Sequence, residues 1–127
     1  MKKILMVLLA CMILSGCATM PTREQLANID YGTPLTIDYE QAIKQYFNKV
    51  LFDPYSAVYE FSSPQQYWIQ MPPILGGKLL SGYMVFVDIN AKNRMGGYTG
   101  TKRWGFLFKN NSIEKVVDPD EMAIARN

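Results

Sequence analysis

The segment DYEQAIKQYFNKVL, residues 38–51, decides how this chain folds. Its apolar residues recur at three- and four-residue intervals, and polar residues fill the positions between them. This spacing predicts an amphipathic helix of about four turns. Asp38, with Gln41 three residues later, is typical of an N-terminal capping box, and Asp53-Pro54 predicts the end of the helix. The polar side is not basic, which favours packing in a core over binding to a membrane surface.

After this helix, the apolar residues recur at every second position, which is typical of β-strands. The strongest strand pattern is apolar on both faces and predicts a central strand. We therefore expect an α+β fold, with one amphipathic helix packed on an antiparallel sheet of four or five strands. The strand candidates are residues 57–61, 66–70, 82–90, 101–108 and 112–117.

The last two strand candidates predict a hairpin with its turn at Asn110-Asn111, because asparagine tolerates the left-handed dihedral angles of a two-residue turn. Five of the six residues that this register pairs on one face are apolar, so we expect that face to meet the helix. A short helix from Pro119 to about Arg126 is expected to follow. The predicted cross-strand pairs are Phe108 with Ile113, Phe106 with Lys115, and Trp104 with Val117.

The first 17 residues have the features of a bacterial lipoprotein signal. Lys2 and Lys3 precede an uncharged apolar run, which is too short to span a bilayer as a mature helix. The run ends in Leu-Ser-Gly-Cys, which resembles a lipobox and predicts a diacylglycerol on the sulfur of Cys17 and cleavage just before it. The alternative is an ordinary secretory signal with a chance cysteine. Ala18, rather than aspartate, predicts export to the outer membrane of a Gram-negative host, facing the periplasm.

The chain divides into three predicted parts: a signal peptide (1–16), an acylated cysteine with a flexible tether (17–35), and one α+β domain (36–127). Without Lys2 and Lys3, 11 basic residues balance 11 acidic ones, which argues against a nucleic acid partner. The part after Cys17 has no cysteine and no histidine. The common catalytic bases, nucleophiles and soft metal ligands are therefore missing, and we expect no enzyme activity, no cofactor and no metal site.

The ten residues 91–100, between two strand candidates, form the candidate binding site, because hairpin loops usually have two to five residues. Glycines let a backbone approach a ligand closely, and basic residues surround them. The functional interpretation is a surface that binds a protein partner, or an anionic or sugar ligand. The structural interpretation is a bulged hairpin whose asparagine and glycines adopt special dihedral angles. The candidate residues are Lys92, Asn93, Arg94, Gly96, Gly97, Tyr98 and Gly100.

Three motifs of the chain resemble a family of small uncharacterised bacterial lipoproteins. They are Leu-Phe-Asp-Pro-Tyr-Ser-Ala (51–57), Asn-Ala-Lys-Asn (90–93) and Gly-Gly-Tyr-Thr-Gly (96–100). The resemblance covers residues 31–117 and implies a lipobox, a tether and one helix-plus-sheet domain, but no activity. We expect a non-catalytic binding or accessory module in a cell-envelope assembly, with an envelope protein as partner. The alternative is a module that binds peptidoglycan or another envelope glycan through exposed aromatic residues such as Trp68 or Trp104. A surface lipoprotein of a prophage is a third interpretation.

Overall fold

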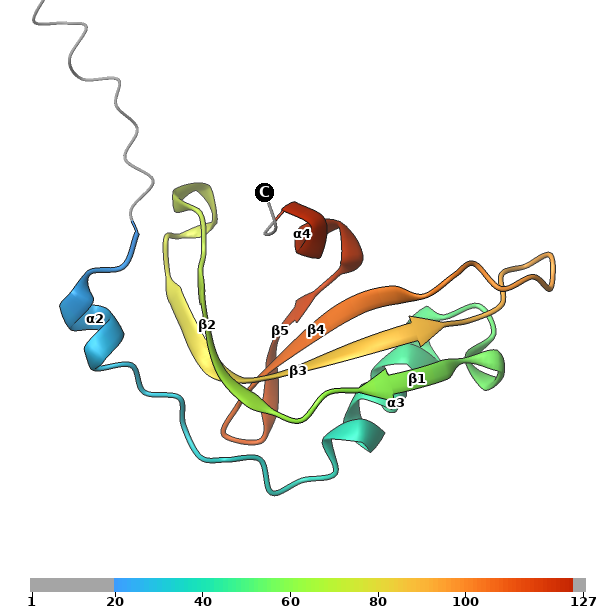
Figure 1. The fold of residues 1–127 in the computed structure, drawn as a ribbon, viewed down its shortest axis with the longest axis horizontal. Helices are drawn as coiled ribbons and strands as arrows, with labels where there is room; N and C mark the ends of the chain where they lie inside the picture. The colour runs from blue at the N-terminus through green and yellow to red at the C-terminus, as the bar shows by residue number, and fades with distance from the viewer. Residues whose placement is uncertain (1–19, 125–127) are drawn as a thin grey trace, which may run out of the picture.

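The computed structural model describes residues 20–124, which form one main helix, several short helices and a five-stranded antiparallel sheet (Figure 1). This is the α+β fold that the sequence predicts. The signal peptide, Cys17 and Ala18 lie outside the described residues. The elements are α2 (Arg23–Ala27), α3 (Tyr39–Val50), η2 (Pro54–Ser56), β1 (Val58–Phe61), β2 (Gln65–Gln70), η3 (Pro73–Leu75), β3 (Leu79–Asn90), β4 (Lys102–Lys109), β5 (Ser112–Val117) and α4 (Pro119–Ile124).

Helix α3 begins and ends as the spacing predicts. Of the two hydrogen bonds in the predicted capping box, one is present: the Asp38 side chain accepts from the Gln41 amide at 3.0 Å, which satisfies one of the free donors of the first turn. Ile43 and Phe47 are completely buried against the sheet. Val50, at the end of the predicted apolar face, is 52% exposed.

Strand β3 is the centre of the sheet, as predicted. It pairs with β4 along one edge, and with β1 and β2 along different parts of the other edge. Ser62 bridges the gap between β1 and β2: its amide donates to the Phe86 carbonyl at 2.8 Å, and its hydroxyl accepts from the Phe86 amide at 2.9 Å. The edge of β3 is therefore hydrogen-bonded continuously while the chain changes direction.

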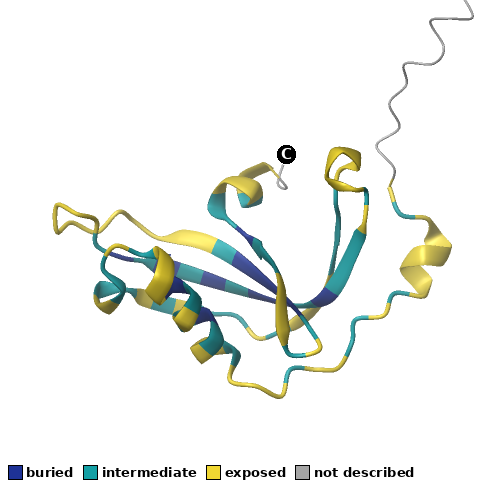
Figure 2. Cartoon of the chain, turned by 180° about the vertical axis from the view of Figure 1, so that it is seen from behind, coloured by how far each residue is buried: buried dark blue, intermediate teal, exposed yellow. Residues whose placement is uncertain are grey.

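The sheet is buried on both faces, although to different extents (Figure 2). The face towards α3 carries the main core, in which the Phe47 ring packs edge-on against Trp104 and Phe106 with centroid distances of 5.3 and 5.6 Å. The other face carries a smaller cluster of Met84, Leu107 and Val117. The main core consists of Ile43, Phe47, Val85, Val87, Ile89, Phe106 and Phe108.

The predicted β4–β5 register is right at the turn and wrong beyond it. Asn110 and Asn111 have φ angles of 49° and 65°, and Phe108 pairs with Ile113. A β-bulge then adds one residue to β5, so Phe106 pairs with Val116 instead of Lys115. Trp104 likewise loses its predicted partner, because Val117 pairs with Gly105.

The bulge has a clear physical reason. Without it, Lys115 would lie on the face that packs against α3, where a charged group has no water. In the observed register Val116 packs against the main core instead. Lys115 turns to the other face, and its Nζ lies 3.0 Å from a carboxylate oxygen of Glu121 in α4.

The described part of the predicted tether (17–35) includes helix α2, which starts with both hydrogen bonds of a capping box between Thr22 and Gln25. The segment after it contacts the domain. The Asp30 carbonyl accepts hydrogen bonds from the Ser81 hydroxyl at 2.7 Å and from Lys109 Nζ. Asn110 and Asn111 accept hydrogen bonds from the amides of Thr33 and Thr36, at 3.1 and 3.0 Å. The chain from Asp30 onward is therefore held against the β4–β5 turn.

Candidate functional site

Asparagine side chains fold the predicted binding loop, residues 91–100. Asn93 Oδ1 accepts hydrogen bonds from the amides of Met95 and Gly97, at 2.9 and 3.3 Å, and Asn90 Oδ1 accepts one from the Gly100 amide at 3.2 Å. These bonds stabilise the turn at the loop tip and the return towards β4. The two asparagines of the Asn-Ala-Lys-Asn motif therefore have a structural role in the loop.

The three candidate glycines differ in what they do. Gly96 and Gly100 have φ angles of 78° and 94°, which residues other than glycine rarely adopt. Gly97 has no positive φ, and a Cβ added at any of the three would meet no atom within 4 Å. Gly96 and Gly100 are thus needed for the backbone path, while open space surrounds Gly97.

Residues of the loop contact the segment that follows α3 through hydrogen bonds and cation–π contacts. The Tyr98 hydroxyl donates to the Ser56 carbonyl at 3.1 Å, and the Ser56 hydroxyl accepts from the Lys92 amide at 2.9 Å. Lys92 Nζ lies 5.5 Å from the centroid of the Tyr98 ring, and Arg94 Cζ lies 5.6 Å from that of Phe52. These are cation–π distances, so the two cations rest on aromatic rings.

These contacts produce a mixed apolar and basic surface at the end of the molecule where the β3–β4 connection projects (Figure 1). Tyr55 is 100% exposed, Met95 94% and Phe52 64%, and Tyr98 is also exposed. We call this set the loop-end surface: Phe52, Tyr55, Lys92, Arg94, Met95 and Tyr98. The structure thus brings together three predicted candidates, Lys92, Arg94 and Tyr98, and adds three residues that the sequence analysis did not select.

Arg103, which the sequence places next to the loop, is engaged in the sheet. Its guanidinium donates two hydrogen bonds to the Asp88 carboxylate, at 2.8 and 2.7 Å. These bonds and the negative charge of Asp88 raise the pKa of Arg103 above its ordinary value. Glu60 pairs across the strands with Asp88. Asp88 therefore belongs to a surface ion pair between β3 and β4, and the negative charge of Glu60 in β1 adds to the field at Arg103.

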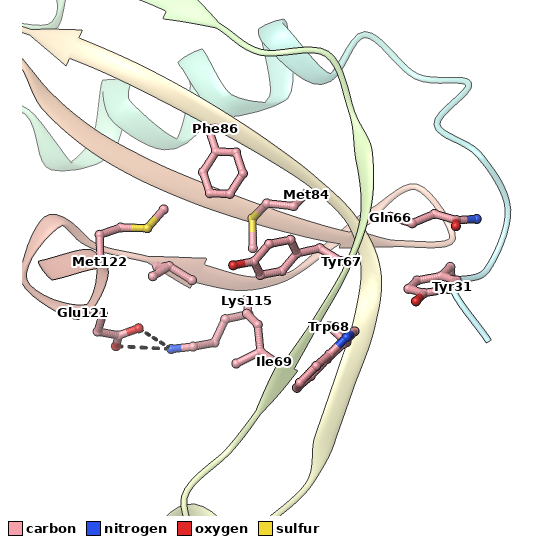
Figure 3. A pocket seen from close by; sticks show the side chains of 11 residues that line it. Tyr31, Gln66, Tyr67, Trp68, Ile69, Met84, Phe86, Lys115, Glu121 and Met122 are labelled. Carbon is pink, nitrogen blue, oxygen red and sulfur yellow. Dashed lines mark hydrogen bonds and ion pairs between the residues drawn. The ribbon is translucent and has the colours of Figure 1, made fainter. Parts of the chain in front are cut away.

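A second candidate site, which the sequence analysis missed, is a cavity of about 570 Å³ between β2 and α4 (Figure 3). Its volume is in the usual range for small-ligand sites. Apolar and aromatic side chains make up most of its lining, and the Lys115–Glu121 ion pair lies at one side. The lining residues are Tyr31, Gln66, Tyr67, Trp68, Ile69, Met84, Phe86, Lys115, Val117, Glu121 and Met122.

The two tryptophans have different neighbours, although the strand register places both on the face of β3 that carries Ser81 and Val87. Trp68 lines the cavity, whereas Trp104 packs against Phe47 on the α3 face. Both are half-buried. The one sequence signal for the cavity was the apolar second face of β3, at Met84 and Phe86. Which segments cover that face depends on contacts between distant parts of the chain.

Comparison of the chain with protein-family models, with curated proteins and with solved structures gave no match. The resemblance to small bacterial lipoproteins therefore remains a prediction. Within residues 20–124, no group of three or more acidic residues is placed to hold a metal ion. The helices in that range are also too short or too polar to cross a bilayer.

Proposed function

We propose that this protein is a bacterial lipoprotein, anchored through an acylated Cys17, that acts as a non-catalytic binding module in a cell-envelope assembly. The Leu-Ser-Gly-Cys sequence supports the anchor, and Ala18 supports a location on the periplasmic face of the outer membrane. Two or more buried acyl chains are enough for stable membrane attachment. The mature chain has no net charge, so attraction to anionic lipid adds little to its binding.

The loop-end surface is the observation that supports a binding role most strongly. Exposed aromatic residues, methionine and arginine are the residue types enriched at protein interfaces and at their hot spots. The internal hydrogen bonds of Asn93 and the bond from Tyr98 to Ser56 hold the loop in one shape before a partner arrives. Such preorganisation lowers the entropy lost on binding. We assign the contact with an envelope protein to this surface.

Alanine at Lys92, Arg94 and Tyr98 together is expected to reduce the crosslinked partner recovered from intact cells by about tenfold or more. The triple variant removes two cations and one ring from the loop-end surface while Asn93 keeps the turn. Mass spectrometry after a pull-down with the native anchor measures the recovery.

The matched control exchanges the same residue types elsewhere, at Arg23, Lys78 and Tyr67, and should recover the partner at the normal level. If the loop variant recovers it equally well, the assignment to the loop-end surface is wrong. Loss in the control alone would also contradict the assignment, because the partner would then depend on residues outside the loop-end surface.

Binding of an envelope glycan is a second candidate function, and the cavity favours it. Trp68, Tyr67 and Tyr31 supply aromatic rings there, and Gln66 supplies an amide that can bond to sugar hydroxyls. Small-ligand sites commonly combine apolar walls with a few polar groups in this way.

Soluble peptidoglycan fragments are expected to shield Trp68 from acrylamide if this second function is correct. The measurement uses a Trp104→Phe variant, which leaves Trp68 as the one emitting indole and keeps an aromatic ring beside Phe47. A fall in the quenching constant by about twofold or more, saturating with fragment concentration, would support stacking in the cavity. An unchanged constant at saturating fragment would exclude it.

A further inference from the structure

The tip of the β2–β3 hairpin, residues 71–78, exposes apolar side chains to an unusual extent. Ile74 is 90% exposed and Leu75 is 63% exposed, both in the short helix η3. The tip belongs to a long uncharged stretch, because Lys78 is the only charged residue between Phe61 and Val87. Bringing this hairpin against an apolar phase would therefore desolvate almost no charge.

The tip holds its shape through its own hydrogen bonds. The Met71 amide donates to the Lys78 carbonyl at 2.9 Å, and the Gln70 side-chain amide donates to the Gly77 carbonyl at 2.7 Å. Gly76, with a φ of 95°, ends η3 in a left-handed conformation. Ile74 and Leu75 are thus presented outward by a closed turn.

The hairpin tip lies at the same end of the molecule as the start of the described chain (Figures 1 and 2). Residues of α2 line a common pocket with Leu79, which directly follows the tip. Met20, the first described residue, is also exposed. Two residues lie between Cys17 and Met20, so three residue steps span at most about 11 Å. Acyl chains on Cys17 would therefore bring a bilayer close to this end.

We propose that the hairpin tip is a second membrane contact, which inserts Ile74 and Leu75 into the interfacial layer of the bilayer that holds Cys17. This inference rests on the proposed lipid anchor. The occupant is a lipid surface because the exposed residues are aliphatic, the hairpin is nearly free of charge, and Cys17 lies within a short span. Lys78, at the base of the tip, can extend its ammonium towards lipid phosphates while its methylenes stay in apolar surroundings.

The contact orients the domain. With η3 towards the bilayer, the loop-end surface lies at the far end of the sheet (Figure 1). Two aliphatic side chains bury much less area than an acyl chain, so the tip positions the domain but does not anchor it by itself.

A single cysteine labelled with the fluorophore NBD tests the inference, because the mature chain has no other free thiol once Cys17 is acylated. Ile74→Cys reports on the tip, and Met95→Cys, an equally exposed position on the loop-end surface, is the matched control. Each lipidated protein is reconstituted into phosphatidylethanolamine–phosphatidylglycerol vesicles. We expect a blue-shifted NBD emission at residue 74, quenched at least about twofold by lipids with a spin label near the headgroup, and water-like emission at residue 95.

Flotation of the vesicles separates the two proposals. Protein that floats while NBD at residue 74 remains water-like would overturn the tip contact and leave the anchor intact. Similar blue shifts at residues 74 and 95 would also overturn it, because the domain would then lie flat. Protein that does not float would contradict the lipid anchor, and it would also contradict the tip contact, which depends on that anchor. Adding Leu75→Asp should reduce the shift at residue 74 without preventing flotation.

Discussion

Alanine in place of Phe47 is expected to lower the free energy of unfolding by about 3–5 kcal/mol. Phe47 is fully buried, and its ring packs against Tyr46, Tyr59, Trp104 and Phe106. Truncation removes the apolar surface of the ring and leaves a cavity that the sheet on one side and the helix on the other cannot easily close. Since domains are typically stable by about 5–15 kcal/mol, this is a large fraction of the total. Urea denaturation followed by tryptophan fluorescence measures the change.

Val50→Ala is the matched control, because Val50 lies in the same helix and is half exposed. We expect it to change the free energy of unfolding by less than about 0.5–1 kcal/mol. If the two variants had similar stabilities, α3 would not supply the main core, and the packing of helix on sheet described above would be wrong.

The helix could be predicted from sequence because its signals are local. Asp38, the spacing of Ile43 and Phe47, and Pro54 all lie within about four turns, and each contributes in the same direction. Asn110-Asn111 is local in the same way, since the two residues themselves adopt the dihedral angles of the turn. For these elements, nearby residues determine the backbone conformation.

The β-bulge in β5 could not be predicted from its own residues. Alternation alone would place Lys115 opposite Phe106, and only the position of α3 makes that arrangement unfavourable. Glu121, which pairs with Lys115, is in a helix on the other face of the sheet. The pairing of β1 and β2 with different parts of one edge of β3 is similarly non-local, because Ser62 bridges the gap by bonding to a strand 24 residues away.

The candidate loop was predictable by its length and its glycines, but not by the roles of its asparagines. Asn93 was selected as a possible ligand-binding residue, and in the structure its side chain bonds to the loop's own amides. Tyr55 and Phe52 were not selected, because only folding brings η2 and the end of α3 beside the loop. The cavity was missed for the same reason, since its lining comes from residues as distant as Tyr31 and Met122.

Two groups of exposed apolar residues lie at opposite ends of the domain. Ile74 and Leu75 belong to η3, at the end near the start of the described chain, and the loop-end surface with Phe52, Tyr55 and Met95 lies at the β3–β4 loop. A lipid anchor at one end leaves the other free for a protein partner. The twelve residues of β3 span most of the distance between the two ends, so in the proposed arrangement this strand would separate the membrane from the partner.

Serine in place of Cys17 is expected to move the protein almost completely from the membrane fraction to the soluble fraction. The serine hydroxyl cannot receive the thioether-linked diacylglycerol, and the two residues at the hairpin tip bury too little area to hold the domain on a bilayer alone. An ordinary cleavable secretory signal must replace residues 1–16 in this variant, because an uncut apolar signal would itself retain the protein. Fractionation and immunoblotting measure the distribution, and circular dichroism should show an unchanged fold.

Cys11→Ser is the matched control for this prediction, since it makes the same exchange inside the signal, six residues before the predicted acylation site. It should leave the protein in the membrane fraction, because the predicted cleavage before Cys17 removes Cys11 with the signal. A Cys17→Ser protein that still sediments with membranes after its signal is cleaved would contradict the proposal that acylation of Cys17 is the main membrane attachment. Combining that variant with Ile74→Asp then shows the source: release would make the hairpin tip an anchor in its own right, and continued sedimentation would point to a protein partner in the membrane.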